Sequence, residues 1–550
     1  MVFEKKRRHL ARYIEIGRIL ARHQFEHLMT QLGLADVFHL RHRGRGLLPD
    51  PTDVRESLEE LGPTFIKLGQ LLSTRTELLP ALYIKELQKL QDTAPAVPTP
   101  EVLSVIEEEL GSPAQRLFAE FSEEPLAAAS LGQTHAGRLK DGTKVVVKVQ
   151  RPGVDKIIET DVEIMQGIAH FLEHHSARLR DYDIVQLVEE FAVTIRRELD
   201  YTYEGRNTDK IRENLSNLNF VVVPRVFWEY TTPRVLTIER ISGIKVTDIR
   251  GMEELGIDRK SVAHNLTNAF MEMIFIHGFF HADPHPGNLV VLDGNTIGLL
   301  DFGMVGRLDR RLKTGLTILL AEYVQEDSGG FAEELLRIGS WGEDLNRRAF
   351  EADIDRALRP YFGAPLKDVR LGELLRNAFQ ISARHRVRLP SSLALLVKVL
   401  VNIDGIDRQL DPEFDFASEA KPYVKRSMRE VFSLQTLFSQ AYRSLVQLRD
   451  LLIAFPDRTY DLLERLVEGS LRINFRHLGL ESAIRAVERA ANRLSLALIT
   501  SATIVASALL MAAKIGPSWN GYPIMGLAGF GLSFLFAVWL IIFTLRSGKL

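Results

Sequence analysis

The 550-residue sequence predicts an α+β protein of two lobes, preceded by a helical extension and followed by a C-terminal hairpin of two apolar helices. Three observations lead to this prediction. In residues 144–150, valines recur at every second position, as in a β-strand with one buried face. Residues 277–303 have the pattern of loop, hairpin and loop, with oxygen-bearing side chains on both loops. Residues 494–513 and 524–545 are long stretches without a charge.

The chain is nearly neutral and contains no cysteine. It has 69 basic and 71 acidic residues, so it lacks a global basic excess, and we expect no nucleic acid among its partners. The absence of cysteine excludes disulfides, thiolate catalysis and cysteine-based zinc or iron–sulfur sites. A length of 550 residues predicts several structural units rather than one.

Residues 1–46 form the first predicted unit, a basic amphipathic helix. Apolar residues recur on one face at helical spacing, and basic residues crowd the start of the helix. The apolar residues are Leu10, Tyr13, Ile14 and Leu20, and the basic residues are Lys5, Lys6, Arg7, Arg8, Arg12 and Arg18. Two interpretations fit this pattern equally well: a helix lying on an anionic membrane surface, or a helix packed on the protein itself.

The second unit, residues 47–121, is a helical extension centred on the motif Lys67-Leu-Gly-Gln70. Lys67 and Gln70 are three residues apart and share a helix face, and Gly69 between them permits the close approach of another backbone. Taken alone, this pattern is that of an ordinary amphipathic helix.

Residues 122–243 are predicted to form the first lobe, with a helical insert. The lobe begins with the pattern of strand, tight loop, strand, turn and strand. The tight loop is Ala127-Ala128-Ala129-Ser130. On the last strand, Val145, Val147 and Val149 share one face, which leaves Val146, Lys148 and Gln150 on the other. We therefore expect a sheet with an apolar face and a lysine on the opposite face.

The second lobe, residues 244–412, contains the chemically informative stretch. Asp283 and Asn288 lie five residues apart on one loop, and Asp301 opens the next loop in Asp-Phe-Gly. Protein kinases place a catalytic-loop Asp and Asn at the same interval, and a metal-binding Asp beyond them. Carboxylate and amide oxygens are hard ligands that suit Mg²⁺. We expect Asp301 to bridge metal and phosphates, Asn288 to hold a metal, and Asp283 to orient or deprotonate the attacking hydroxyl or water.

A zinc site is the competing interpretation of this stretch. His281, Asp283 and His285 could supply its ligands. Because such a site leaves Asn288 and Asp301 without a role, we rank it below the magnesium site.

The order of the segments also assigns nucleotide-binding roles to the first lobe. Lys148 takes the position of the kinase lysine that contacts the α- and β-phosphates, Val146 lies over the adenine, and the Ala127–Ser130 loop covers the phosphates. The hinge, whose backbone would bond the adenine, begins at Glu239 and includes Ile241. Lys148 needs a helix carboxylate as partner, and spacing alone does not decide among Glu163, Glu198, Asp200 and Glu204.

Five motifs in this order resemble the UbiB (AarF) family of atypical kinase-like proteins. They are Lys67-x-Gly-Gln, the alanine-rich loop, Glu198-Leu-Asp200, His-Ala-Asp-Pro-His-Pro-Gly-Asn and Asp-Phe-Gly, and the resemblance covers residues 50–410. It implies a two-lobed protein-kinase-like fold, ATP and Mg²⁺ as cofactors, and a link to ubiquinone and other prenyl-lipid metabolism. It also implies that Glu204 pairs with Lys148. Glu198 and Asp200 would then face Lys67 and Gln70, whose helices cover the site where a protein substrate would normally dock.

The sequence after Gly303 runs directly into a helical pattern, without Ala-Pro-Glu and without an obvious activation segment. This favours an ATPase or a small-molecule or lipid kinase over a true protein kinase. The rival from another class is a non-catalytic, nucleotide-sensing scaffold that recruits quinone-biosynthesis enzymes. The complete set of Asp283, Asn288 and Asp301 favours chemistry.

The C-terminal residues predict membrane attachment. Residues 413–493 form an amphipathic helical connector, for which helix packing or a homodimer is the simplest role. Residues 494–545 read as two transmembrane helices, because each uncharged stretch is long enough to cross a hydrocarbon core of about 30 Å. The alternative is a buried helical hairpin of a soluble domain. Small residues Gly529, Ser533 and Ala537 are expected to pack on Ala508 and Ala512.

Basic residues flank this hairpin. Those outside the apolar stretches are Arg485, Arg489, Arg493, Arg546 and Lys549, with Lys514 between the stretches. The positive-inside rule then places both ends in the cytoplasm. We expect a multi-pass protein of the bacterial inner membrane, with the catalytic domain facing the cytoplasm and with membrane lipid and prenyl-quinone precursors as partners.

Overall fold

The computed structural model describes residues 2–23, 25, 49–73, 79–90, 94–175, 183–342, 345–362, 371–431, 480–513, 517–519 and 522–546, and the isolated positions 445, 449, 460 and 467. The chain divides into two compact units, Met1–Ser439 and Gln440–Leu550.

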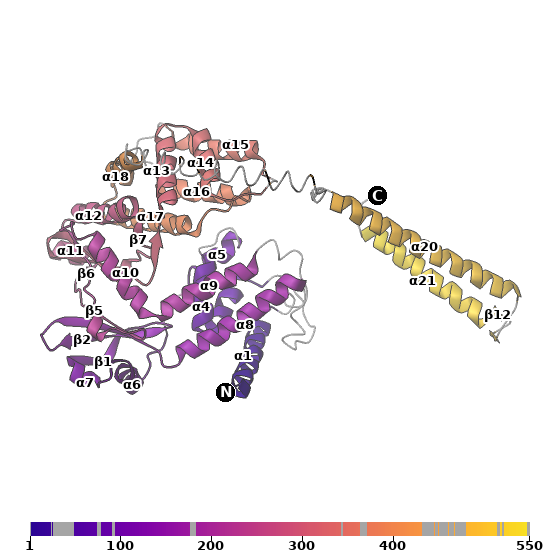
Figure 1. The fold of residues 1–550 in the computed structure, drawn as a ribbon, viewed down its shortest axis with the longest axis horizontal. Coiled ribbons are helices and arrows are strands. Elements are labelled where there is room, and N and C mark those ends of the chain that lie inside the picture. Colours follow the sequence, from indigo (N-terminus) through magenta and orange to yellow (C-terminus); the bar gives the residue numbers. More distant parts are fainter. Residues whose placement is uncertain are drawn as a thin grey trace. The chain divides into compact units, whose positions relative to one another are not determined.

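A four-stranded antiparallel sheet forms the first lobe (Figure 1). Its strands, in spatial order, are β1 (Phe118–Ala128), β2 (Gly132–Leu139), β3 (Lys144–Gln150) and β5 (Val235–Glu239). One face packs on helix α6 (Thr99–Leu110), and the three valines predicted for that face, Val145, Val147 and Val149, are fully buried there. The predicted alternation of this strand is confirmed.

The opposite face of the sheet meets helix α10 (Tyr201–Asn214). Tyr201 of this helix packs with Leu236 and Ile238 of β5, and Val146 of β3 lies against the same cluster. Lys148, two residues after Val146, therefore projects toward a helix that carries a carboxylate.

The helical extension packs on the helical insert of the first lobe. The helices concerned are α3 (Pro51–Leu61), α4 (Pro63–Ser73), α5 (Ala81–Leu87), α8 (Val154–His175) and α9 (Ile184–Leu199). A Cβ atom on Gly69 would lie 2.3 Å from Leu90 Cδ1 and 2.8 Å from Leu58 Cδ1. The close approach predicted at Gly69 is present, although it is to leucine side chains rather than to a backbone.

The N-terminal helix α1 (Val2–Arg22) packs on α3 and α8. Ile16 and Ile19 are buried in the same cluster, whereas Leu10 and Ile14 are exposed. Of the two interpretations of this helix, packing on the protein is the one that the described contacts show.

A half-buried arginine, Arg12, connects α1 to the other helices. Arg12 donates to both carboxylate oxygens of the fully buried Asp161 of α8, at 2.7 and 3.0 Å. It also donates to the carbonyl oxygen of Leu61 at 2.7 Å, and Thr64 of α4 donates to Asp161 at 2.6 Å. Three helices thus meet at one carboxylate.

The second lobe is mainly helical. Its first elements are α11 (Ile249–Glu254), α12 (Arg259–Met271), a π-helical turn (Glu272–His277), β7 (Phe279–His281), β8 (Leu289–Leu292), β9 (Thr296–Leu299) and β10 (Val305–Arg307). β8 and β9 form the predicted hairpin. Its turn places Gly294 and Asn295 in the left-handed backbone region, with φ of 70° and 61°, which these residue types tolerate.

The helices of this lobe follow at once. They are α13 (Arg310–Val324), α14 (Ser328–Ile338), α15 (Arg347–Leu358), α16 (Leu371–Arg384), α17 (Ser391–Leu410) and α18 (Phe416–Val431). The chain passes from Asp301 through β10 into α13, so these residues leave no room for an activation segment. Phe416 and Ala420 of α18, beyond the predicted boundary at residue 412, are buried in the core of the second lobe. Most of the remaining connector lies outside the described residues.

The C-terminal unit contains α20 (Leu480–Ala513) and α21 (Ile524–Arg546). Among the described residues, one helical segment, Leu494–Ala513, is long and apolar enough to cross a membrane, and the apolar part of α21, Ile524–Trp539, is shorter. The sequence predicted two membrane-crossing helices. By length and composition, only one of them, Leu494–Ala513, meets the requirement among the described residues. Only 11% of the longer segment is buried within the protein, whereas a core helix of a soluble protein is mostly buried.

The two apolar helices pack through small residues, but not the predicted pairs. A Cβ on Gly529 would lie 2.0 Å from Ser507 Oγ, and Ser507 and Ser533 are both buried. Ala508 and Ala512 are exposed instead. The contact face of α20 is thus rotated by one residue from the predicted one.

Candidate active site

The centre of the site is an ion-paired lysine between the lobes. Lys148 Nζ of β3 donates to Glu204 Oε1 of α10 at 2.5 Å and to Asp301 Oδ2 at 3.0 Å. Glu204 is thus the partner of Lys148, as the resemblance implied. Glu163, which spacing alone allowed, lies 3.1 Å from His9 instead.

Burial and mutual charge interactions shift the pKa values of Lys148, Glu204 and Asp301. Burial would lower the pKa of Lys148, but the Asp301 and Glu204 carboxylates raise it well above the ordinary value. Burial raises the pKa of Glu204 against the opposing effect of Lys148. Loss of solvent would likewise raise the pKa of Asp301, but Lys148 and the Gly303 N–H outweigh it and hold the pKa below the ordinary value. Asp301 is therefore a carboxylate at any physiological pH.

Asp301 has an unusual backbone conformation. Its φ is 56°, in the left-handed region that aspartate tolerates better than most residues, and its Oδ1 accepts from Gly303 N at 3.1 Å. The next residue, Phe302, is fully buried and packs on the ring of His281. Asn207 of α10 donates to the Phe302 carbonyl oxygen at 3.1 Å. The backbone conformation of the Asp-Phe-Gly loop is thus fixed from both lobes.

Local hydrogen bonds stabilise the predicted catalytic loop, residues 283–288. Asn288 Nδ2 donates to the backbone oxygen of Asp283 at 3.2 Å, and His285 Nδ1 accepts from Gly287 N at 3.1 Å. Asp283 Oδ1 accepts from Lys398 Nζ of α17 at 2.8 Å. Lys398 was not predictable as a site residue, because a lysine on an amphipathic helix gives no signal of a distant partner.

The donor set fits a magnesium ion. Asn288 keeps its amide oxygen free to act as a ligand because its nitrogen is the atom that donates to the loop. Asp301 supplies a carboxylate held in its ionised form by Lys148. Hard oxygen donors of this kind, few in number, are what Mg²⁺ takes when substrate phosphates and water complete its shell.

The alanine-rich loop is a tight turn. Ala127 and Ala128 still pair with β2, and the Ala129 N–H donates to the Gly132 carbonyl oxygen at 2.8 Å. Ser130 at its tip is buried. The loop is therefore a compact connection between β1 and β2.

Gly132 closes this loop onto the rest of the lobe. A Cβ at this position would lie 2.3 Å from the Tyr201 hydroxyl oxygen and 2.5 Å from the Val149 carbonyl oxygen. Any larger side chain would push the loop away from β3 and α10.

The predicted hinge lies where the chain passes between the lobes. Glu239 ends β5, and the next backbone N–H, of Arg240, donates to the Lys144 carbonyl oxygen at 2.9 Å. Ile241 is partly buried, and its Cγ2 would be 3.0 Å from a Cβ on Gly298 of β9. Ile241 thus contacts the second lobe directly.

Lys67 of α4 pairs with Glu198 as the resemblance implied, but two other predicted contacts of this group differ. Lys67 Nζ lies 2.9 Å from Glu198 Oε2 of α9. Asp200 instead caps α10, accepting from the backbone N of Thr202 at 3.0 Å and from its hydroxyl at 2.7 Å. Gln70 donates to the Leu90 carbonyl oxygen at 3.4 Å, inside the extension. The ion pair between the extension and the lobe is therefore Lys67 with Glu198.

The zinc alternative is not supported. His281 is fully buried between the rings of Phe270 and Phe302, and burial lowers its pKa. In the described part of the chain, His281, Asp283 and His285 do not bring three ligand atoms together.

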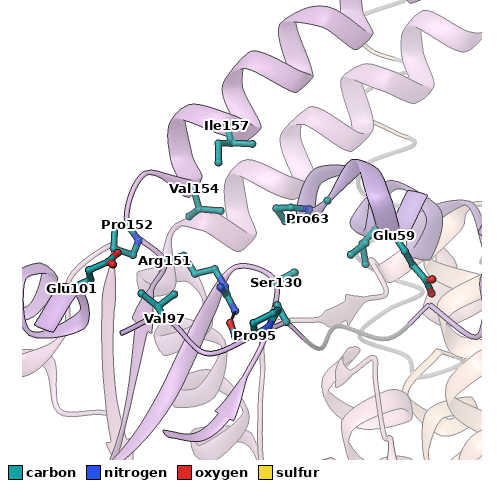
Figure 2. A pocket seen from close by; sticks show the side chains of 13 residues that line it. Glu59, Pro63, Pro95, Val97, Glu101, Ser130, Arg151, Pro152, Val154 and Ile157 are labelled. Atoms are coloured by element: carbon teal, nitrogen blue, oxygen red, sulfur yellow. Dashed lines mark hydrogen bonds between the residues drawn. The ribbon is translucent and has the colours of Figure 1, made fainter. Parts of the chain in front are cut away.

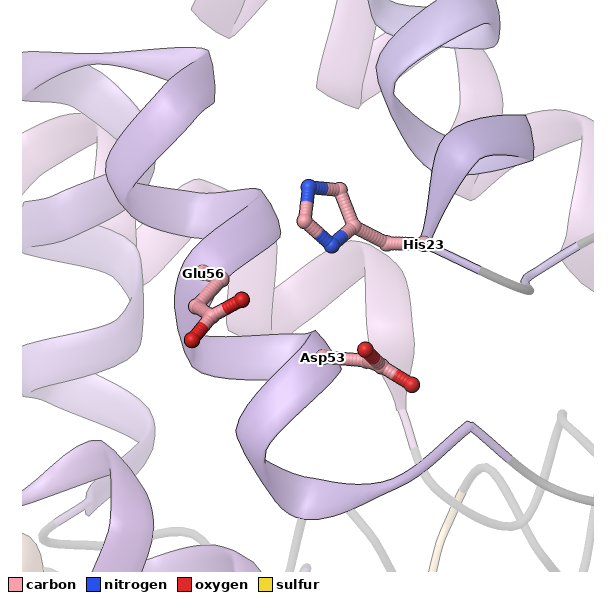
Figure 3. A group of neighbouring side chains, drawn as sticks. All are labelled: His23, Asp53 and Glu56. Carbon is pink, nitrogen blue, oxygen red and sulfur yellow. The ribbon is translucent and has the colours of Figure 1, made fainter.

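Among the described residues, one group has metal-ligand chemistry. His23, Asp53 and Glu56 bring ligand atoms within 4.8 Å of one another (Figure 3). However, His23 bonds Glu60 at 3.1 Å, and Glu56 pairs with Arg55 at 3.1 Å. The first contact joins the residue after α1 to α3, and the second lies within α3. We assign no metal to the group.

A cavity of about 400 Å³ lies beside the alanine-rich loop (Figure 2). Pro63 and Ile66 of α4, Val97, Arg151 and Val154 line it. Of the residues predicted to bind nucleotide, only Ser130 borders this cavity. It is therefore a space between the extension and the first lobe, and the nucleotide is not assigned to it.

Comparison with known proteins agrees with this geometry. Residues 89–335 match the ABC1 atypical kinase-like domain, residues 354–415 the UbiB helical domain, and residues 478–546 the ABC1/UbiB kinase-like C-terminal domain. A probable protein kinase UbiB of Pseudomonas putida is 36% identical over 473 residues, covering 84% of this chain and 87% of that protein. A protein from the hydrogenase 1 5′ region of Clostridium pasteurianum is 32% identical over 502 residues, which cover 91% of this chain and 94% of that protein. The chloroplastic Arabidopsis thaliana protein ACTIVITY OF BC1 COMPLEX KINASE 8 is 34% identical over 481 residues, which cover 79% of this chain and 62% of that protein.

Proposed function

The chain belongs to the ABC1/UbiB family of atypical kinase-like proteins, and from this premise we propose that it is a Mg-ATP-dependent ATPase or small-molecule or lipid kinase. The observation that carries the proposal is the closed ion pair of Lys148 with Glu204, with Asp301 3.0 Å from the same ammonium. A lysine so placed can hold nucleotide phosphates, and Glu204 keeps it in position.

The remaining residues take complementary roles. Asp301 and Asn288 would hold Mg²⁺, which neutralises phosphate charge when bound. Asp283 orients or deprotonates the attacking hydroxyl or water. The Ala127–Ser130 loop covers the phosphates, and Val146 with the backbone from Glu239 to Ile241 holds the adenine.

The acceptor proposed is a small molecule or lipid. The Lys67–Glu198 ion pair brings α4 against the first lobe, and the chain leaves no room for an activation segment that would present a protein substrate. The family is linked to ubiquinone biosynthesis, so prenyl-quinone precursors and membrane lipid are the proposed ligands, with quinone-biosynthesis enzymes and a second copy of the chain as proposed partners.

The C-terminal helices are proposed to anchor the protein. Large apolar side chains on both remain exposed, among them Leu498, Leu509, Phe534 and Leu535, each more than 60% exposed, as lipid-facing residues would be. We propose that α20 anchors the protein in the bacterial inner membrane through Leu494–Ala513 and that the catalytic lobes face the cytoplasm.

Phosphate release by the purified full-length protein tests the function. We expect Mg²⁺-dependent release from ATP that rises with membranes or phenolic lipid precursors. Asp301→Asn should abolish productive Mg-ATP turnover and leave the fold intact, since its neighbours keep their places. Asp155→Asn, an exposed aspartate of α8, is the matched control. Wild-type turnover in Asp301→Asn would contradict the assignment, and nucleotide binding without any turnover would favour the scaffold.

A further inference from the structure

Among the residues that the structure describes, Lys398 is the one outside the predicted motifs that bonds the proposed catalytic Asp283 directly. It lies in α17, between Val397 and Val399, which are buried in the core of the second lobe. Its Nζ is 2.8 Å from Asp283 Oδ1, and the two side chains are 37% and 40% exposed. The buried neighbours fix the helix, so the ammonium is brought to the loop by packing rather than by a flexible segment.

The catalytic loop has no fixed cation of its own. Between Asp283 and Asn288 stand Pro284, His285, Pro286 and Gly287. The one titratable side chain, His285, is engaged at Nδ1 by the Gly287 N–H. The positive charge beside Asp283 therefore comes from a helix 115 residues further along the chain.

The bond to Lys398 uses one of the two carboxylate oxygens. Within the described residues, Asp283 Oδ2 has no hydrogen-bond partner, whereas Oδ1 is engaged. An exposed aspartate without such a partner samples several rotamers, and only some of them direct an oxygen at the acceptor.

We propose that Lys398 is a positioning residue for phosphoryl transfer, an inference that rests on the proposed function. It holds Asp283 through Oδ1 and leaves Oδ2 to accept the hydrogen bond of the attacking hydroxyl or water. In the transfer, the acceptor proton passes to Oδ2 and the acceptor oxygen forms a bond to the γ-phosphorus. The bond from the γ-phosphorus to the bridging oxygen breaks, and its electron pair leaves with ADP.

The helical part of the second lobe thereby has a direct role at the site. Residues 354–415, which match the UbiB helical domain, contain Lys398. A shift of α17 would turn the base away from the acceptor without touching the nucleotide residues.

Kinetics of the full-length protein test the proposal. Lys398→Met should lower kcat by about 10- to 100-fold, the scale of a misplaced catalytic group, while affinity for Mg-ADP changes less than about twofold. Lys398→Arg should recover part of kcat because it restores the donor. Lys260→Met is the matched control, since it removes another lysine–aspartate pair of this lobe (3.6 Å from Asp411) and should leave kcat unchanged. Lys398→Gln replaces Lys398→Met if the latter does not fold.

Two further measurements separate positioning from general stability. In the Asp283→Asn background, Lys398→Met should cause no additional loss of kcat, because the two residues act as one unit. Hydrogen exchange in the peptide spanning residues 281–288 should rise in Lys398→Met and not in Lys260→Met. An equal additional loss in the Asp283→Asn background would overturn the proposal, as would a Lys398→Met protein that matches Lys260→Met in kcat while the wild type turns over. A wild type that binds Mg-ADP but never releases phosphate would instead overturn the proposed function itself.

Discussion

Replacing Lys67 with methionine should loosen the helical extension and alter nucleotide binding. Lys67 Nζ lies 2.9 Å from Glu198 Oε2, and the two side chains are only 17% and 19% exposed. Methionine keeps most of the length of the side chain, so the principal loss is the charge. Glu198 is then left as a largely buried carboxylate that has lost this partner.

The magnitude follows from this partial burial. Exposed ion pairs contribute about 0.2–1 kcal/mol, and removing one partner of a fully buried pair costs about 3–5 kcal/mol. The Lys67 and Glu198 side chains are each less than one-fifth exposed, so their pair lies between these limits. We expect Lys67→Met to lower the free energy of unfolding by about 2 kcal/mol. Since α4 carries Lys67, part of that loss should appear as local opening of α4 rather than as global unfolding.

The assay compares Lys67→Met with Lys85→Met, which removes an exposed lysine of α5. Thermal melts with and without Mg-ATP, hydrogen exchange across residues 63–73, and turnover would be measured on both proteins. Glu198→Gln combined with Lys67→Met gives the coupling energy, expected at about 1–2 kcal/mol. If Lys67→Met and Lys85→Met behave alike in exchange, melting and turnover, the pair does not hold the extension to the lobe and the reasoning is refuted.

Two further predictions concern the membrane and the second lobe. Truncation before Leu494 should release the protein from membranes fully at high salt and only partly at low salt. The reason is that each basic residue near an anionic surface contributes about 1 kcal/mol of binding free energy, which salt screens. Full release at low salt in a flotation assay would show that no basic segment touches lipid. Asp407 of α17 is fully buried, accepts from the Thr267 hydroxyl, and has its pKa raised well above the ordinary value by burial. The folded protein therefore keeps Asp407 protonated at pH values above about 4, where the unfolded chain has released that proton. The free energy of unfolding of the wild type falls over this window, until the pH has passed the folded pKa. The stability of Asp407→Asn relative to wild type should thus increase with pH over that window in urea melts, and a constant difference would show that Asp407 does not titrate.

Local patterns predicted the local parts of the site. The alternation of Val145, Val147 and Val149 placed Lys148 on the correct face, because the two-residue period of a strand fixes which side chains share a face. The Asp293–Asn295 turn was equally readable, since few residue types tolerate its left-handed positions. Both features depend on neighbours in sequence.

Long-range partners were not readable in the same way. Four carboxylates had suitable spacing for Lys148, and only the arrangement of α10 over the sheet selects Glu204. Asp200 looked like a partner for Lys67, but its position one residue before a helix makes it a cap. Lys398 stands 115 residues from Asp283, and no periodicity connects them. Choices of this kind are made by tertiary packing rather than by local preference.

The anchoring of α1 has a practical consequence for anyone who shortens or tags this protein. The guanidinium of Arg12 neutralises Asp161, a carboxylate with no exposed surface, and the same carboxylate receives the hydroxyl of Thr64 near the start of α4. Deleting residues 2–22 would remove that guanidinium and leave a buried charge with a hydroxyl donor alone, at a cost of about 3–5 kcal/mol. The damage would fall three residues before Lys67, so a shortened protein that purifies well could still give misleading nucleotide affinities. Affinity tags belong at the other end of the chain, and activity measured on N-terminally trimmed protein should be compared with the full-length protein before it is interpreted.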